Sequence, residues 1–267
     1  MKSNRILRRA LEYAAGFDLP VVFMPQDPDI AEGGSAHEGA TAARMGLVGI
    51  PETAETVALA RDLLLVEQTG VQAHFSGLTS ARAMDMLADA QARGLRVSAD
   101  VAMYQLLLCD EDLEGFSSLL HVQPPLRSKQ DRHALRQAVQ SGVVQAIASH
   151  HQPHEQEAKR VPFAASAPGI SSVEILLPLA LTLVADGLLE LPALLARLTC
   201  GPARALNLPV GTISLHERAD ITLFDPVAAS LIGHNWLSKG ANCPFIGQGA
   251  PCKVTHTISN GKLVYQA

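Results

Sequence analysis

Histidines cluster directly after a short apolar segment in the middle of the chain. Ala146-Ile147-Ala148 runs into the sequence Ser149-His150-His151-Gln152-Pro153-His154. Barrel enzymes place their catalytic side chains at the carboxyl ends of their strands, and histidine serves there as a metal ligand or as a general base. The position of the cluster therefore indicates an active site, and the other residues of that site decide whether its chemistry is complete.

Two interpretations of the cluster are open. His150, His151 and His154 could bind a metal of their own, or they could form a hydrogen-bonded cluster without one. Pro153 denies them regular helical spacing, and the nearby carboxylates are Glu155 and Glu157, so the spacing favours the second interpretation.

Two residues elsewhere, His74 and Gly169, are best interpreted as structural. His74 lies beside another predicted strand end, and we interpret it as a structural histidine with satisfied ring nitrogens, because it lacks the expected co-ligands. Gly169 is most simply a turn residue.

Composition narrows the class of protein. The chain has 267 residues, 48% of them hydrophobic, which is enough for one large domain, or one and a half, with a buried core. The formal net charge of −5 and the absence of a block of like charge disfavour nucleic acid and anionic membranes as partners.

The location follows from several smaller features. The most apolar run, 176–184, is too short to span a bilayer, and the first residues have no apolar segment typical of a secretory signal. Cys109, Cys200, Cys243 and Cys252 form no CxxC pair, which suits reduced thiols better than a disulfide framework. We therefore expect a cytoplasmic protein.

Predicted strands and helices alternate through the first half of the chain. The strands are 19–24, 71–75, 96–103 and 143–148, and the helices are 5–15, 52–69, 79–93 and 129–140. Thr79 and Ser128 are the expected N-caps of the last two helices, and 25–51 is expected to be a long irregular loop. Apolar strands that alternate with helices predict a parallel sheet, either a TIM-type barrel or a doubly wound sheet.

The pattern changes after the fourth strand. Helices are expected at 171–186 and 191–198, and Gly201 opens a short third helix. Strands follow at 219–225, 254–259 and 262–265, the last two joined by the hairpin turn Asn260-Gly261. We therefore divide the chain into residues 1–208, a partial (β/α) barrel, and residues 209–267, a C-terminal β-module.

Motifs in this order resemble the dihydroorotase branch of the amidohydrolase superfamily. They are His121-Val122-Gln123-Pro124-Pro125-Leu126-Arg127, then 147–154, then Ala167-Pro168-Gly169-Ile170-Ser171-Ser172-Val173-Glu174, then 219–226. The tail 236–245 is most similar to the non-catalytic dihydroorotase-like chain that accompanies aspartate carbamoyltransferase in some bacteria. The resemblance implies the later part of a metal-dependent (β/α)8 barrel with a small C-terminal β-sandwich module.

The residues that such enzymes use are largely replaced here. Active members carry a His-x-His pair at the first strand, and this chain contains none. The resemblance puts Met24 and Gly77 at two further histidine ligand positions, and His150 at the aspartate that serves as last ligand and base. Gln123 stands where the family has a substrate-binding asparagine. His154, Pro168 and Gly169 still match the substrate-holding positions.

These replacements remove the parts that the reaction needs. Hydrolysis of a cyclic amide requires a metal-bound hydroxide, a carboxylate that moves its proton and a cation for the substrate carboxylate. Methionine is a poor ligand for zinc, and glycine has no side chain to offer. We therefore expect a dead catalytic centre without bound zinc, which His150→Asp alone does not revive.

Two functions follow from the resemblance. The first is a catalytically inactive structural partner of the aspartate carbamoyltransferase catalytic chain, in a hetero-oligomer of pyrimidine biosynthesis. The second is a zinc-dependent amidohydrolase, a dihydroorotase or a relative acting on another cyclic amide, whose first ligands lie outside this chain. In both cases the barrel is expected to begin partway, with strand edges that something else must cover.

Overall fold

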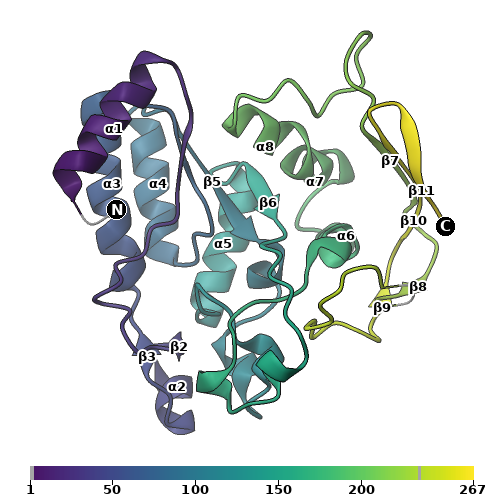
Figure 1. Ribbon diagram of the computed structural model, residues 1–267, viewed down its shortest axis with the longest axis horizontal. Helices are drawn as coiled ribbons and strands as arrows, with labels where there is room; N and C mark the ends of the chain where they lie inside the picture. Colours follow the sequence, from purple (N-terminus) through teal and green to yellow (C-terminus); the bar gives the residue numbers. More distant parts are fainter. Residues whose placement is uncertain (1–2, 234–235) are drawn as a thin grey trace.

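A sheet of parallel strands forms the centre of the molecule. The computed structural model describes residues 3–233 and 236–267. The sheet has the strand order β1-β4-β5-β6 (Figure 1). Its strands are β1 (Val21–Phe23), β4 (Ala73–Phe75), β5 (Val97–Ala102) and β6 (Ala146–Ala148). Every pairing is parallel, so the carboxyl ends of all these strands meet at one end of the sheet, the mouth.

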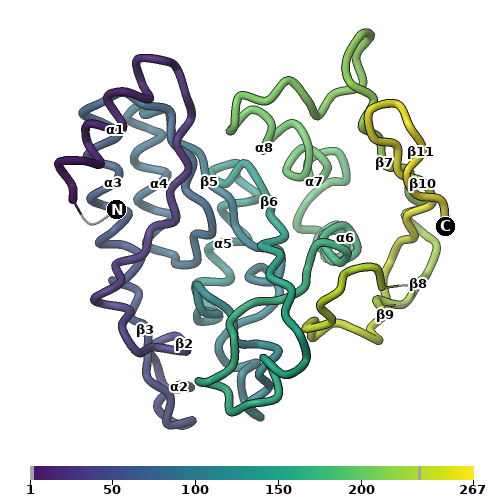
Figure 2. Tube along the Cα trace, viewed as in Figure 1, coloured from purple at the N-terminus to yellow at the C-terminus, as the bar shows by residue number. Residues whose placement is uncertain are grey.

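Helices alternate with these strands, as expected for a barrel-type fold. They are α1 (Asn4–Gly16), α3 (Thr53–Thr69), α4 (Ala81–Ala92) and α5 (Lys129–Ser141). Each packs against the next, α1 on α3, α3 on α4 and α4 on α5, and the Cα trace shows them as one layer beside the sheet (Figure 2).

The helix caps confirm one prediction and correct another. Ser128 caps α5 in a capping box with Asp131, where the sequence placed it. Thr79 was predicted to cap α4, but the cap is Ser80, whose hydroxyl accepts a hydrogen bond from the Ala83 amide. Thr79 lies one residue before the cap, and its amide and hydroxyl donate to the buried carboxylate of Glu55, as do the amide and hydroxyl of Ser80.

The stretch between β1 and α3 is more ordered than the sequence indicated. It contains β2 (Ala36–His37), α2 (Ala40–Met45) and β3 (Gly49–Ile50), and β2 pairs with β3 in parallel. The expectation of an irregular loop was therefore wrong. Strands of two residues and a helix of six are too short to show a hydrophobic period.

Short 3-10 helices line the mouth and the connections around it. They are η1 (Met103–Leu106), η2 (Asp110–Leu113), η3 (Ser118–Leu120), η4 (Glu157–Lys159), η5 (Phe163–Ala165) and η6 (Val173–Ile175). After them come α6 (Leu176–Ala185), α7 (Leu191–Leu198) and α8 (Cys200–Ala205). Within the described residues, no helix is both long and apolar enough to cross a membrane.

The C-terminal β-module lies at the opposite end of the molecule from α1 (Figure 1). Antiparallel strands β7 (Ile221–Asp225), β10 (Lys253–Ser259) and β11 (Lys262–Gln266) form one sheet. The pair β8 (Ser230–Leu231) and β9 (Gly249–Ala250) forms another. Asn260 and Gly261, both with positive φ, make the predicted hairpin turn. The division at residues 208 and 209 stays a prediction.

Apolar side chains remain uncovered at two places. β1 and β6 are the edge strands of the central sheet. Around β1, Leu19 is 52% exposed, Val22 53% and Met24 64%. A groove of about 890 Å³ lies between α6, α7 and the C-terminal sheet, lined by residues such as Leu176, Leu198, Phe224 and Val254. Large exposed apolar surfaces of this kind mark contact sites.

Candidate functional site

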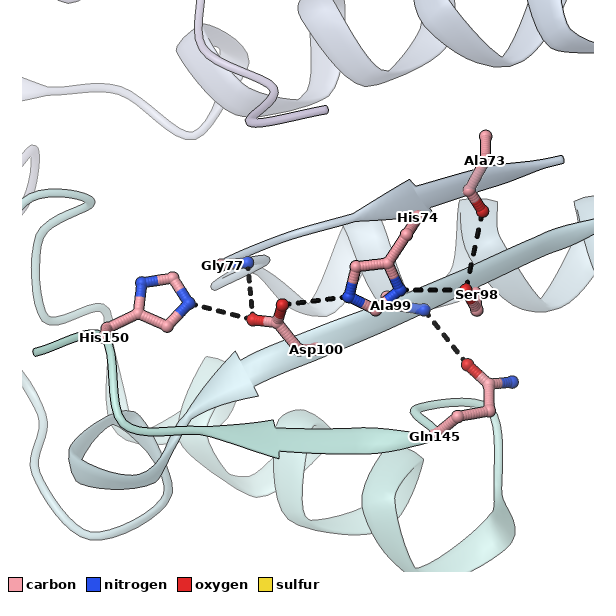
Figure 3. Close-up of polar contacts among 8 residues, drawn as sticks. All are labelled: Ala73, His74, Gly77, Ser98, Ala99, Asp100, Gln145 and His150. Carbon is pink, nitrogen blue, oxygen red and sulfur yellow. Dashed lines mark hydrogen bonds and ion pairs between the residues drawn. The ribbon is translucent and has the colours of Figure 1, made fainter. Parts of the chain in front are cut away.

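The mouth of the sheet brings a histidine, a carboxylate and a second histidine together. His74 lies on β4, Asp100 on β5, and His150 follows β6 by two residues. All three side chains come from the carboxyl ends of neighbouring parallel strands (Figure 3), which is where the sequence placed the site.

Asp100 joins the two histidines. Its Oδ2 lies 3.0 Å from His74 Nε2, and its Oδ1 lies 2.8 Å from His150 Nε2. Oδ1 also accepts the amide of Gly77 at 2.9 Å. Burial alone would raise the pKa of Asp100, but the hydrogen bonds from His150 and His74 hold its pKa well below the ordinary value. The carboxylate is therefore ionised and fully used by its neighbours.

His74 has a partner at each ring nitrogen. Nδ1 lies 2.8 Å from Ser98 Oγ, and Nε2 lies 3.0 Å from Asp100 Oδ2. The residue is 5% exposed. The structure thus agrees with the interpretation of His74 as a satisfied structural histidine, and it shows that this imidazole lies in the site itself.

Gly77 and His150 fit each other because the glycine has no side chain. The φ of Gly77 is +72°, and a Cβ built there would lie 2.6 Å from His150 Cε1. His150 itself has a φ of 47°, an uncommon value for a residue with a side chain. The imidazole of His150 therefore occupies the space that a side chain at position 77 would need.

The remaining cluster histidines are used by the loops of the mouth. His151 Nδ1 accepts the amides of Ser172 and Val173. His154 Nε2 lies 3.0 Å from the carbonyl oxygen of Pro168. These contacts agree with the interpretation of the cluster as hydrogen-bonded.

Asn242 connects the loop that contains His154 with the loop that contains Gly169. Its Oδ1 accepts the amide of His154 at 2.8 Å, and its Nδ2 donates to the carbonyls of Gln152 and Gly169. Gly169 needs to be glycine, because its φ is +137° and an added Cβ would lie 2.5 Å from Gln152 Cβ. The sequence reading of Gly169 as a turn residue was thus incomplete, since close packing also requires it.

The other predicted positions lie apart from this network. Met24 directly follows β1, and its side chain is 64% exposed. Gln123 precedes a cis peptide bond to Pro124. The carbonyl oxygens of Pro124 and Pro125 accept hydrogen bonds from Gln105 Nε2. A buried lysine, Lys159, donates to the carbonyls of Ser118 and His121 and so holds the start of this loop.

Sequence reasoning missed three residues that organise the mouth. They are Asp100, Asn242 and Lys159. Asp100 and Lys159 lie outside the motifs that carried the resemblance, and Asn242 lies in the tail 236–245, where the resemblance gave it no role. Asp100 had the clearest available signal, because a carboxylate inside an apolar strand requires buried partners.

The donor set of the described residues does not fit a catalytic metal. His74 has both nitrogens engaged, His150 uses Nε2 on Asp100, and Gly77 offers no ligand atom. Nowhere in residues 3–233 and 236–267 do three or more His, Cys, Asp or Glu side chains gather in a way that could hold a metal ion. The expectation that no zinc binds stays a prediction.

Comparison with known proteins identifies the family. The model of the amidohydrolase family matches residues 30–264. This chain belongs to the amidohydrolase family. A dihydroorotase-like protein of Pseudomonas aeruginosa is 66% identical over 264 residues, which cover 99% of this chain and 62% of that protein. A dihydroorotase of Syntrophus aciditrophicus is 41% identical over 262 residues, 98% of this chain and 62% of that protein.

Solved structures agree on the fold. The L-hydantoinase of Arthrobacter aurescens superimposes with a TM-score of 0.84 at 21% identity, over 99% of this chain and 61% of that one. A dihydropyrimidinase of Brevibacillus agri gives a TM-score of 0.85 at 22% identity, over 100% and 61%. The resemblance to the dihydroorotase branch and the TIM-type fold are thus confirmed. The chain spans a little under two thirds of the length of these relatives.

Proposed function

We propose that this chain is a catalytically inactive dihydroorotase-like protein that acts as a structural partner of aspartate carbamoyltransferase in pyrimidine biosynthesis. The observation that carries the proposal is the pairing of His150 with Asp100 at 2.8 Å. At the position where the resemblance implies a catalytic aspartate, the chain has an imidazole that is bound to a neighbouring carboxylate.

The geometry explains why a base at this position would lack its chemistry. A general base must reach the proton that it removes, but His150 Nε2 is directed at Asp100 and its ring lies against Gly77. Asp100 is likewise occupied, by His74, His150 and the Gly77 amide. The polar groups at the centre of the mouth are thus hydrogen-bonded to one another.

The surfaces that remain apolar support a role in assembly. Edge strands present unpaired backbone groups, and the exposed side chains of Leu19, Val22 and Met24 surround the β1 edge. Covering them would remove apolar area from water at about 25 cal/mol per Å². We propose that the catalytic chain of aspartate carbamoyltransferase supplies the cover, in a cytoplasmic hetero-oligomer. All four cysteines are free thiols without a disulfide, which suits the reducing cytoplasm.

A second candidate is a zinc-dependent dihydroorotase, or another hydrolase of cyclic amides. The observation that favours it is the 41% identity to the Syntrophus dihydroorotase, of which this chain spans 62%. Ligands absent from this chain could lie in the part of such a protein that it does not span. In that case His150, Gly77 and Met24 would still be the chain's contribution to the centre.

Metal content and turnover distinguish the two. The protein is purified as its cell produces it, with any segment that this chain does not span, and without tag or chelator. Zinc and manganese are then measured by elemental analysis alongside hydrolysis of dihydroorotate. We expect less than one metal equivalent and no metal-dependent turnover, in the wild type and in His150→Asp. One tightly bound equivalent, or turnover by either protein, would support the enzyme instead.

A further inference from the structure

A second polar network lies away from the histidines of the mouth and involves residues 25–51, here named the flap. The flap comprises β2, α2 and β3. An ion pair joins Arg44 of the flap to Glu114, the residue after η2. The two side chains are 59% and 62% exposed, so the pair contributes little to stability. The buried attachment of the flap is made by Arg127.

Arg127 holds both short strands of the flap at once. The side chain is almost fully buried, with 3% of the residue exposed. Nη1 donates to the carbonyl of Ile50 on β3 at 2.9 Å and lies 3.1 Å from Nδ1 of His37 on β2. Nε donates to Thr79 Oγ1 at 3.1 Å, and Thr79 in turn donates to Glu55. One guanidinium thus connects the flap with the start of α4.

The chemistry of the pair fixes the state of His37. A guanidinium can only donate hydrogen bonds, so Nδ1 of His37 must be the acceptor. The imidazole is therefore neutral, with its proton on Nε2. A proton added to Nδ1 would remove the acceptor and place two cations 3.1 Å apart.

Carboxylates around His37 act in the opposite direction. Asp131 at the start of α5, Asp110 of η2 and Glu38 of the flap all favour the protonated ring, whereas burial and Arg127 oppose it. Burial is the largest influence and Arg127 the next, so the pKa of His37 is lowered from 6.5. Asp131 is also engaged by the amides of Ala81 and Ser128.

We propose that Arg127 and His37 form a clasp that keeps the flap closed at neutral pH and releases it in acid. Release transfers one proton from hydronium in the acidic solvent to His37 Nδ1, which leaves water, and it breaks the hydrogen bond that Arg127 Nη1 donates to that nitrogen. Because the closed state disfavours the proton, the open state binds more protons below pH 6.5, and closure weakens as the pH falls through that value.

Hydrogen exchange tests the clasp on the full chain, purified with any partner that it carries. Amide protection of residues 36–50 is measured at pH 7.5 and pH 5.5, corrected for intrinsic exchange, and referred to β4 and β5 of the same molecule. One unit below an open-state pKa of 6.5, closure can weaken by up to about tenfold. We expect flap protection to fall toward that limit while the strands keep theirs.

Variants separate the clasp from general acid effects. His37→Gln keeps an acceptor for Arg127 but does not titrate, so its flap protection should not change with pH. His133→Gln removes an exposed histidine of α5 and should behave as the wild type. Equal acid losses in the wild type and His37→Gln, or no loss in the wild type, would overturn the proposal.

Nuclear magnetic resonance of the imidazole nitrogens gives a second test that does not depend on a variant. The proposal expects the Nε2-protonated tautomer of His37 at pH 7.5 and a pKa below 6.5. A pKa at or above 6.5, or a proton on Nδ1 at neutral pH, would overturn it.

Discussion

The mouth of the sheet and the edge of the sheet at β1 differ in whether their side chains find partners within the chain. At the mouth, Asp100 accepts hydrogen bonds from His74, His150 and the Gly77 amide, so the polar groups are satisfied from within. At the β1 edge, Val22 and Met24 are more than half exposed, so the apolar groups lack partners. The difference indicates a chain whose polar groups at the mouth maintain its own structure, while its edge exposes apolar surface suited to contact.

Removing the shared carboxylate should break the mouth most severely. Asp100→Ala leaves His74, His150 and the Gly77 amide without their acceptor, and loss of one partner of a buried charged network costs about 3 to 5 kcal/mol. Urea unfolding at pH 7 measures the loss. Asp85→Asn, on the exposed side of α4, is the control and should change stability by less than about 0.5 kcal/mol. A similar small change for Asp100→Ala would show that the network is dispensable.

A smaller perturbation tests the contact of Gly77 with His150. Gly77→Ala adds a Cβ that would lie 2.6 Å from His150 Cε1, at a φ of +72°. Gly70→Ala is a matched control, because Gly70 has a φ of +68° and no atom within 4 Å of an added Cβ. Both variants bear the left-handed strain of about 1 kcal/mol, and overpacking adds about 1 to 3 kcal/mol for Gly77 alone. Equal losses of unfolding free energy would contradict the close contact.

Lys159 makes the mouth sensitive to alkaline pH. Burial lowers the pKa of Lys159 to about 8 from 10.5, so the folded state binds fewer protons than the unfolded state between these values. Stability should therefore rise with pH across that window, by at most about 1.4 kcal/mol per pH unit. Urea unfolding measures the unfolding free energy of the wild type and of Lys159→Met from pH 7 to pH 10. The difference between the two proteins gives the contribution of the Lys159 amino group at each pH. A difference that does not change with pH would refute the assignment.

A charge at the β1 edge should affect contact rather than folding. Val22→Lys places an ammonium group on a side chain that is 53% exposed, and Leu64→Lys does the same on α3 at 66%. Both should leave unfolding free energy within about 0.5 kcal/mol of the wild type. Only Val22→Lys should reduce the association of the chain in sedimentation. Equal behaviour of the two variants would show that the β1 edge is not a contact surface.

Much of the fold could be predicted because it depends on local signals. The helix at 191–198 and the cap at Ser128 were found where apolar spacing and an N-cap serine predict them. The cap predicted at Thr79 was wrong by one residue, because Thr79 and Ser80 are adjacent hydroxyl residues that local sequence does not tell apart, and the helix begins after Ser80. The elements of the flap were not predicted because strands of two residues and a helix of six are too short for a hydrophobic pattern to repeat.

The site was predictable only in part, for a similar reason. His150, His154 and Gly169 follow motifs, so the sequence indicated where the mouth lies. The partners that fill it, Asp100 and Asn242, act through contacts between segments far apart in the chain. No local pattern in the sequence shows such contacts, because they form only when the chain is folded.

Co-expression with the aspartate carbamoyltransferase catalytic chain of the same organism tests the central claim most directly. The two proteins are purified through a tag on the carbamoyltransferase, and the mass of the product is determined by sedimentation. We expect one complex that contains both chains, while the chain alone is oligomeric or aggregates. A stable, cooperatively folding monomer that does not co-purify with the carbamoyltransferase would contradict both the structural role and the need for a partner at the sheet edges.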